Sequence, residues 1–377
     1  MKFRVERDVL AEAVTWVARG LPSRPPVPVL AGVLLEATAE GELTLSAFDY
    51  EVSARITVPA DVTEAGTVLV LGRLLADISR NLPAKPVEIV ADGNKVQVVC
   101  GSSRFALLQM PAGDYPTLPT SPNPTGSIDG STFTQAVAQV AVAADRGDTL
   151  PILTGVRVEV DGEKMTLLAT DRYRLAMREL TWNPGTPDSA HVALVPARTL
   201  SETARALGAA GSIDVAFGDE AGGDGLVGFE AGRRRTTSRL LDGEYPKVAK
   251  IFPSSSEIEA VIATADLIEA VKRVALVAER NTPVRLRFTD GSVAIEAGTG
   301  EDAQASEAVE AHVQGPDVEI AFNPGYLLDG LGAVGKDYVR FALTAPQKPA
   351  MLTGQESLEA DVDTSYRYVL QPVRLAS

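Results

Sequence analysis

One short stretch of the chain combines two arginines, a tyrosine and a leucine, and it directly follows an apolar, strand-like run. The stretch reads Thr170-Asp171-Arg172-Tyr173-Arg174-Leu175. Apolar side chains beside guanidinium groups give an apolar floor with charged edges, which is typical of surfaces that capture a short segment of another protein. The same residues also fit a polar turn in which Asp171 accepts hydrogen bonds from its own backbone.

Catalytic and metal-binding chemistry has few candidates. Asp171 and Asp49, which stands 122 residues earlier in a related stretch, could in principle pair as acid and base. Because the two aspartates stand at equivalent positions of two repeats, a structural role in the same turn of each repeat is favoured over an acid–base pair. The single cysteine, Cys100, lies in an apolar strand-like run, and no G-x-S-x-G motif occurs. His191 and His312 have no neighbouring cysteines, so we expect no metal, no cofactor and no catalytic residue.

The run from Gly330 to Lys336 contains the glycine spacings of nucleotide-binding loops. Such a loop needs a strand before it and a helix after it, so that the helix N-terminus faces the phosphate. Here a helical pattern precedes the glycines and the strand pattern 338–343 follows them. The glycines are therefore interpreted as the end of a helix and a turn.

Composition limits the class of protein. The 377 residues are enough for two or three domains, and a formal net charge of −15 argues against a general binder of polyanions. One cysteine leaves no disulfide within the chain and indicates a reducing, cytoplasmic setting. The N-terminus has charges where a signal peptide has an apolar run, and no apolar stretch reaches the length of a membrane span.

Internal repeats decide the organisation. The pattern Pro28-Val29-Leu30-Ala31-Gly32-Val33 returns as Pro151-Ile152-Leu153-Thr154-Gly155-Val156, and Gly113-Asp114-Tyr115-Pro116 returns as Gly243-Glu244-Tyr245-Pro246. A fainter third copy follows. Strand-like and helical periodicities within a copy give the order βαβββ, twice. In the third copy they predict a second helix over 324–334. In the first copy they predict a strand over 29–37 and two helices, one with Asp8 as its cap and Leu10, Ala13, Val14 and Val17 on its apolar face, the other with Leu71, Leu74, Leu75, Ile78 and Leu82 on its apolar face. We expect an α+β protein with three tandem domains, at residues 1–122, 123–252 and 253–377.

Basic residues recur at related places on the predicted helices although the chain is acidic. Arg73 and Arg80 stand seven residues apart and so share a helix face, and Arg198 and Arg205 occupy the corresponding helix of the second copy. Solvated helix faces with incidental arginines remain the alternative explanation.

With three doubled βαβββ domains, the stretch 170–175, the sequence Asp242-Gly243-Glu244-Tyr245-Pro246 and the ending Gln371-Pro372-Val373-Arg374-Leu375, the chain resembles the bacterial DNA sliding clamp, the beta subunit of DNA polymerase III. The resemblance covers essentially all residues. It implies a homodimer closed head to tail into a ring, with helices inside and sheets outside. Twelve helices of about 10 Å diameter surround an opening on the order of 28 Å, wide enough for a DNA duplex.

The resemblance also implies the sites and the partners. Its partners are encircled duplex DNA, read without sequence preference, and the polymerase III alpha subunit, the clamp loader and other proteins bound through short linear motifs, in the cytoplasm near the nucleoid. Arg172-Tyr173 stands where the family often has Gly-His, and Gln371 and Val373 stand where it has methionines, which most resembles the actinobacterial branch. The implied peptide pocket consists of Leu153, Thr170, Arg172, Tyr173, Arg174, Leu175, Pro246, Lys250, Ile251, Asn323, Tyr326, Val369, Gln371, Pro372, Val373 and Arg374. In it, Leu153, Leu175 and Val373 are expected at the floor, and Tyr326, Arg174 and the backbone near Pro372 at the rim. The implied DNA-binding residues are Arg24, Arg73, Arg80, Arg146, Arg198 and Arg205, and the implied dimer interface is Phe105, Leu107, Leu276 and Val277.

Two other functions stay open on the residues alone. One is a repeat-built scaffold that binds peptides without DNA. The other is an acid–base enzyme that uses Asp171 with Arg172 and Arg174.

Overall fold

The computed structural model describes residues 1–22, 24–147, 149–218, 225–248, 251–253, 255–279, 282–298 and 303–374. Within these ranges the predicted βαβββ order occurs six times, twice in each copy. The first copy comprises β1 (Lys2–Val5), α1 (Arg7–Ala18), β2 (Gly32–Ala37), β3 (Glu42–Phe48), β4 (Val52–Pro59), a short β5 (Asp61–Glu64), β6 (Gly66–Leu71), α2 (Gly72–Asn81), β7 (Val87–Asp92), β8 (Lys95–Cys100) and β9 (Ser103–Leu108).

The other two copies follow the same plan. The second comprises β10 (Gly126–Asp129), α3 (Gly130–Ala141), β11 (Gly155–Asp161), β12 (Lys164–Thr170), β13 (Arg174–Thr181), a short β14 (Asn183–Pro184), β15 (Ala190–Pro196), α4 (Ala197–Leu207), β16 (Ser212–Phe217), β17 (Leu226–Ala231) and β18 (Arg234–Arg239). The third comprises β19 (Ile258–Ala263), α5 (Thr264–Val274), β20 (Val284–Thr289), β21 (Ser292–Ala297), β22 (Ala305–Gln314), β23 (Val318–Phe322), α6 (Pro324–Val334), β24 (Tyr338–Leu343), β25 (Ala350–Gln355) and β26 (Asp363–Leu370).

The chain divides into two compact units whose limits do not follow the copies. Unit 1 holds residues 1–131, 183–186 and 202–240, and unit 2 holds the rest. The division cuts the second copy because sheets continue from one copy into the next. In unit 1, β4 of the first copy pairs with β18 of the second. In unit 2, β13 of the second copy pairs with β26 of the third, which builds a twelve-stranded sheet.

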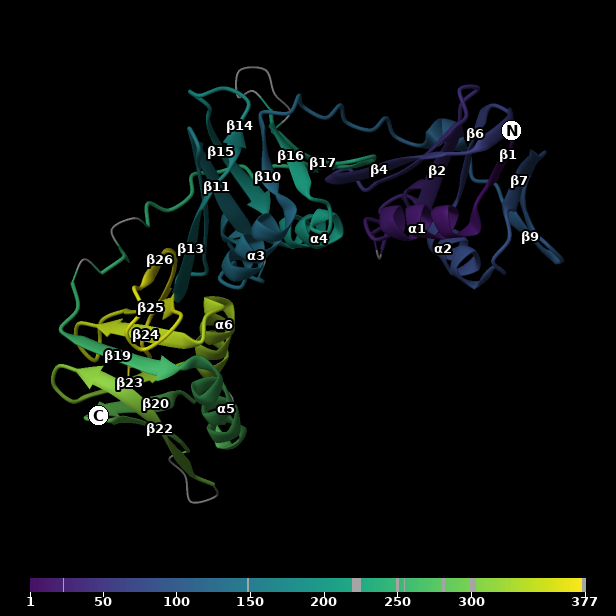
Figure 1. Cartoon of the computed structure of the whole chain (residues 1–377). Helices are drawn as coiled ribbons and strands as arrows, with labels where there is room; N and C mark the ends of the chain where they lie inside the picture. The colour runs from purple at the N-terminus through teal and green to yellow at the C-terminus, as the bar shows by residue number, and fades with distance from the viewer. Residues whose placement is uncertain are drawn as a thin grey trace. The chain divides into compact units, whose positions relative to one another are not determined.

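In unit 1, α1 and α2 pack together, and α1 also covers β2, β3 and β4 (Figure 1). As predicted, the apolar stripe Leu10, Ala13, Val14 and Val17 is buried. The expected cap is wrong: the helix begins after Glu6, without a side-chain cap, and Asp8 lies in its first turn.

Two further local expectations differ from the structure. The run 28–31 forms a 3-10 turn before β2, because Pro28 at its start favours a turn over a strand. The predicted apolar face of α2 is also partly wrong, since Leu71 and Leu74 are 46% and 45% exposed. The helix instead buries its small residues, Gly72, Ala76 and Ser79, beside Leu75 and Ile78. A side chain at Gly72 would collide with Leu21 and Val33, so the helix start approaches its neighbours too closely for a larger residue.

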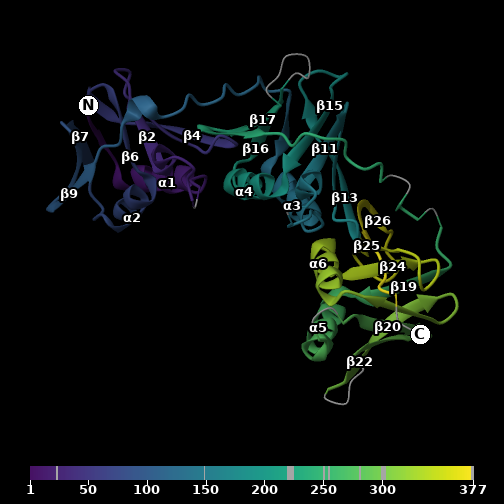
Figure 2. The ribbon, with the colours of Figure 1, turned by 180° about the vertical axis from the view of Figure 1, so that it is seen from behind.

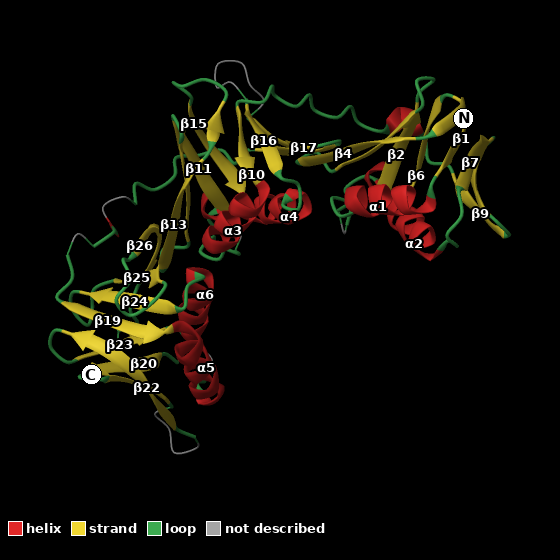
Figure 3. Cartoon of the chain, viewed as in Figure 1, coloured by secondary structure: helices red, strands yellow, loops and turns green. Residues whose placement is uncertain are grey.

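In unit 2, α5 and α6 contact each other and lie on one face of the sheet that contains β19, β24 and β25, with α6 above α5 in the views of Figures 2 and 3. The helix α6 packs on β25 and β26. Gly330 makes this packing close, because a Cβ there would lie 2.4 Å from the ring of Tyr368 on β26. Among the helices of the described ranges, none has the length and apolar character needed for a membrane crossing.

Candidate functional site

The stretch 170–175 contains the turn between β12 and β13, and its own side chains hold that turn. Asp171 Oδ1 accepts hydrogen bonds from the backbone N–H groups of Tyr173 and Arg174, both at 3.0 Å. Thr170 Oγ1 donates to the carbonyl oxygen of Arg174 at 2.6 Å and accepts from the N–H of Arg172. Arg172 takes the left-handed conformation, with φ of 79°. The expectation that Asp171 bonds its own turn is confirmed.

The acid–base alternative does not fit this geometry. Asp171 is 7% exposed, and its second oxygen accepts from Arg174 Nε at 2.9 Å. Both carboxylate oxygens are therefore occupied by donors that a catalytic base would have to give up. Within the described part of the chain, no three His, Cys, Asp or Glu side chains gather as a metal site would require.

Arg174 was expected at the rim of a pocket, but it is buried, with 5% exposure. Its guanidinium donates to Asp171 and, at 2.6 Å, to Asp329 on α6, and it lies 4.4 Å from the centre of the Tyr326 ring. Burial alone would lower the pKa of Arg174, but Tyr368, Asp329 and Asp171 together raise it. This cation joins β13 to α6 from beneath the turn, because a buried charge is retained only where partners surround it.

Above this network lies a hollow of about 270 Å³. Its floor is apolar and fully enclosed: Leu153, Leu175 and Val369 are 2%, 2% and 3% exposed. Its rim is open: the polar residues Arg172 and Gln371 are exposed, and Tyr173 and Ile251 are 53% and 45% exposed. Among the described residues, its lining is Leu153, Thr170, Arg172, Tyr173, Arg174, Leu175, Pro246, Val248, Ile251, Val369 and Gln371. An enclosed apolar floor beneath a polar rim suits one or two large apolar side chains of a peptide.

Among the described residues, five predicted pocket residues lie outside this lining: Asn323, Tyr326, Pro372, Val373 and Arg374. Val373 is 38% exposed, so the expectation that it belongs to the floor is wrong. Asn323 begins α6, where its side-chain oxygen accepts from the N–H of Tyr326 at 3.1 Å. Tyr326 adjoins the hollow through Tyr173, since their rings stack with centres 6.1 Å apart. Pro372 is half-buried and Arg374 is exposed, and Lys250 falls outside the described residues.

The chain end beyond β26 is held in place by its backbone. The N–H of Gln371 donates to the carbonyl oxygen of Tyr173, and the N–H of Val373 donates to that of Ala321, both at 2.8 Å. The tail is therefore fixed beside the turn, and it supplies Gln371 to the hollow. This accounts for the expectation that the turn and the tail belong to one site.

Val248 belongs to the hollow although it was not predicted. It is 6% exposed and lies in the cluster that includes Leu153, Leu175 and Tyr245. The sequence contains a signal for it, because Val248 follows Tyr245 by three residues as Leu118 follows Tyr115 in the first copy. Leu118 packs against the corresponding Tyr115 cluster.

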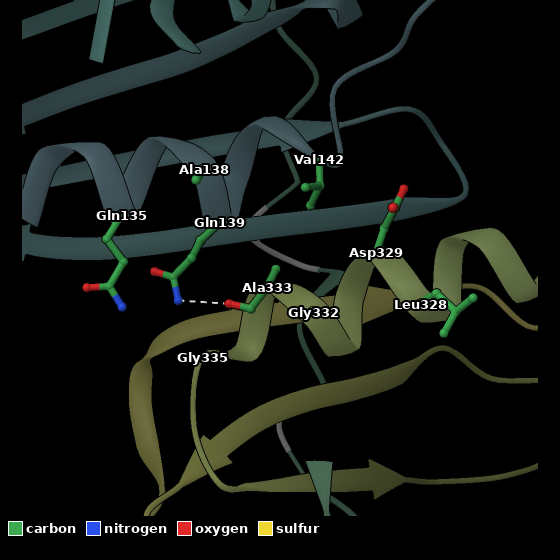
Figure 4. Close-up of a pocket in the computed structure, with 9 residues that line it drawn as sticks. All are labelled: Gln135, Ala138, Gln139, Val142, Leu328, Asp329, Gly332, Ala333 and Gly335. Carbon is green, nitrogen blue, oxygen red and sulfur yellow. Dashed lines mark hydrogen bonds between the residues drawn. The ribbon is translucent and has the colours of Figure 1, made fainter. Parts of the chain in front are cut away.

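The helices α3 and α6 border a groove of about 390 Å³ next to the Arg174 network (Figure 4). Gln139 Nε2 on α3 donates at 2.8 Å to the carbonyl oxygen of Ala333, in the last turn of α6. Gly335 ends that helix with φ of 66°, in the left-handed conformation. The interpretation of the glycine-rich run as a helix end is confirmed, and the bond to Gln139 fixes α6 and its Tyr326 relative to α3.

The other predicted site residues are exposed, except Val277, which is half-buried, and Leu107, which is buried. The six arginines proposed to bind DNA are all exposed, as are Phe105, at 40%, and Leu276, at 83%. Leu107 is only 5% exposed, so the expectation of an exposed edge residue is wrong there. It faces the core of its own domain, and the exposed neighbour on β9 is Leu108, at 67%.

Comparison with known proteins agrees with this fold. Models of the N-terminal, central and C-terminal domains of the DNA polymerase III beta subunit match residues 1–119, 127–247 and 249–370. The chain is 56% identical to the beta sliding clamp of Streptomyces coelicolor over 376 residues, 100% of both chains. It is 57% identical to that of Micrococcus luteus over 309 residues, 82% of this chain and 98% of the relative.

A solved structure is similar over the whole length. The crystal structure of the Pseudomonas aeruginosa sliding clamp bound to griselimycin has a TM-score of 0.91 at 30% identity, and the match covers 100% of both chains. The resemblance to an actinobacterial clamp is confirmed by the Streptomyces relative. Three matched domains, relatives at more than half identity and a shared fold together show that the chain belongs to the DNA polymerase III beta subunit family, the bacterial sliding clamps, which are non-catalytic processivity factors of DNA replication.

Proposed function

We propose that two copies of this chain close head to tail into a ring around duplex DNA and that the hollow beside β13 captures short segments of replication proteins. The proposed partners are the polymerase III alpha subunit, the clamp loader and other proteins with such segments. The observation that carries the proposal is the hollow itself, with Leu153, Leu175 and Val369 buried at its floor and Tyr173 at its open rim. The griselimycin-bound relative supports ligand capture by a clamp of this fold.

Two unpaired strand edges support ring closure. Within the described strands, β9 ends its sheet and pairs only with β8. Residues 305–310 of β22 pair with β21 on one side, whereas pairing with β19 involves only residues 311–314. Exposed strand edges pair with other chains, so we propose that β9 of one copy adds to this part of β22 of another. Arg104 on β9 and Glu310 on β22, both exposed, carry opposite charges.

The exposed arginines support sequence-independent contact with DNA. Arg73 on α2 donates to the carbonyl oxygens of Leu21 and Pro22, each at 3.4 Å, and so lies beside the loop that carries Arg24. Cations on exposed side chains neutralise phosphates without reading bases. We propose Arg24, Arg73, Arg80, Arg146, Arg198 and Arg205 as the DNA-facing set, and the net charge of −15 then lies elsewhere on the surface.

Domains at residues 1–122, 123–252 and 253–377 remain our proposal for the three copies. The order of elements supports these limits, since each range contains one doubled βαβββ. A cytoplasmic location is likewise proposed, and the one cysteine of the chain, buried Cys100, supports it.

The test is retention on DNA. Loaded onto a nicked circle, the protein should stay bound and should leave once the circle is cut, because a ring slides off free ends. Replacing Arg73, Arg80 and Arg205 with Glu should weaken loading onto DNA and should make loading less sensitive to salt, because fewer phosphates are contacted. The dimer should stay intact. Equal retention on circular and linear DNA would contradict the ring, and no retention on either would favour a peptide-binding scaffold without DNA.

A further inference from the structure

The sheet face that forms the floor of the hollow continues beyond it. Thr170, Leu175 and Val369 are direct neighbours on β12, β13 and β26. Two residues along the same strands, Leu168, Met177 and Arg367 are also direct neighbours. Because side chains two apart on a strand point to the same face, the second row continues the face that carries the first.

A second and larger hollow lies over this second row. It measures about 910 Å³, and we name it the outer hollow. Leu168 and Met177 form its floor, at 9% and 8% exposure. Pro246 and Val248, in the linker between β18 and β19, line both hollows. The two hollows are therefore parts of one surface that the linker crosses.

Among the described residues, the outer hollow is lined by more cations than carboxylates: Arg157, Lys164, Lys247 and Arg367 against Glu159, Glu179 and Glu244. Glu179 accepts from Lys164 at 2.9 Å and from Arg367 at 3.1 Å, so one carboxylate serves two cations. Arg157 pairs with Glu159 in addition. The guanidinium of Arg367 also lies 5.1 Å from the centre of the Phe252 ring, which holds it against the wall. Because Lys164 and Arg367 share the single carboxylate of Glu179, a carboxylate of a bound partner could pair with the positive charge that Glu179 does not neutralise.

We infer that the outer hollow binds the residues that flank the short motif in the same partner segment. The inference rests on the proposed function, because the motif itself must occupy the first hollow. An apolar side chain of the flank would cover Leu168 and Met177, and an Asp or Glu of the flank would reach Lys164. The two rows are about 7 Å apart, which an extended segment spans with two or three residues. The exposed Pro246 is the point where the segment crosses the linker.

Calorimetry with matched peptides tests this. The core peptide is of the Gln-Leu-x-Leu-Phe type. Two longer peptides each add a four-residue extension that contains Leu and Asp; one carries it at the N-terminus and the other at the C-terminus. We expect one of the longer peptides to bind about tenfold more tightly than the core peptide, which corresponds to about 1.4 kcal/mol. Replacing its Asp by Lys, or Lys164→Glu in the protein, should remove most of this gain and leave core binding unchanged. Lys95→Glu, on an exposed strand position of unit 1, is the control and should keep the gain.

The outcomes separate the inference from the proposed function. Binding of the core peptide with no gain from either extension would overturn the outer hollow and leave the proposed function standing. A gain that survives Lys164→Glu would overturn the placement over Leu168 and Met177. If none of the peptides bound the wild-type protein, the proposed capture of segments would fail, and the outer hollow with it.

Discussion

Asp49 and Asp171, 122 residues apart, hold two copies of the same turn. Asp49 accepts hydrogen bonds from the N–H groups of Glu51 and Val52, two and three residues later, at 3.0 and 2.6 Å. Asp171 accepts in the same way from the N–H groups of the residues two and three positions after it. The residue after each aspartate, Tyr50 or Arg172, has φ of 76° or 79°. These two are the non-glycine residues with positive φ in the described ranges. The repeat thus extends to individual hydrogen bonds, and the differences between the copies show what makes a hollow.

The residue before the aspartate is such a difference. Phe48 precedes Asp49 and fills the cluster of Leu30, Leu69 and Tyr115, whereas Thr170 precedes Asp171 and lines the hollow. Thr170→Phe should therefore fill the hollow and weaken binding of a motif peptide at least tenfold, measured by calorimetry. Thr170→Val is the matched control, since it removes the hydroxyl without adding bulk, and it should bind more tightly than the Phe variant. Undiminished binding by Thr170→Phe would show that peptides bind elsewhere.

Leu175 contributes to both the fold and the site. It is 2% exposed within the central cluster, so Leu175→Ala should lower the free energy of unfolding by about 2–5 kcal/mol. As a central anchor it should also cost about 2 kcal/mol of peptide binding, roughly thirtyfold in affinity. Leu180→Ala, on the same strand and outside the hollow, controls for the stability loss and should keep its affinity. Similar affinities for both variants would count against Leu175 as an anchor.

The buried cation is the next test. Arg174→Met leaves Asp171 and Asp329 without the guanidinium between them, and such a loss costs about 3–5 kcal/mol of stability. Urea unfolding of Arg174→Met, Asp329→Asn and the double variant gives the coupling between the two residues, expected at about 0.5–3 kcal/mol. Additive effects would mean that the contact at 2.6 Å contributes little to the joining of β13 and α6.

Ring closure predicts effects on the dimer alone. Phe105→Ala with Leu276→Ala removes exposed apolar surface that the proposed interface would bury at about 25 cal/mol per Å². Sedimentation should show a shift toward monomer while thermal stability of the monomer is retained. Leu358→Ala, at another exposed leucine, should leave the dimer unchanged. An unaltered dimer in the double variant would rule out these residues.

Stability at high pH follows from buried phenols. Burial raises the pKa of Tyr115 to about 12, from an ordinary value of about 10. Folding favours the neutral phenol, so its contribution is fully present below pH 10 and is lost as pH rises through 12. The free energy of unfolding should fall across this interval, and less steeply for Tyr115→Phe. Equal slopes for both proteins in urea titrations would contradict the assignment.

The sequence alone determined the repeat, the order of elements and the turn at Asp171, because strand and helix periodicity and turn chemistry are local. The range of α6, 324–334, followed from its proline start and glycine end. Tertiary packing decided the rest. The local sequence predicts Arg174 at the pocket rim, but the fold buries it and brings Asp329, 155 residues later, beside it. Leu107 and Leu74 exchanged their expected exposures because burial depends on which neighbours a face meets. The outer hollow likewise exists only where the linker crosses strands that are paired across two copies, a relationship that no local pattern encodes.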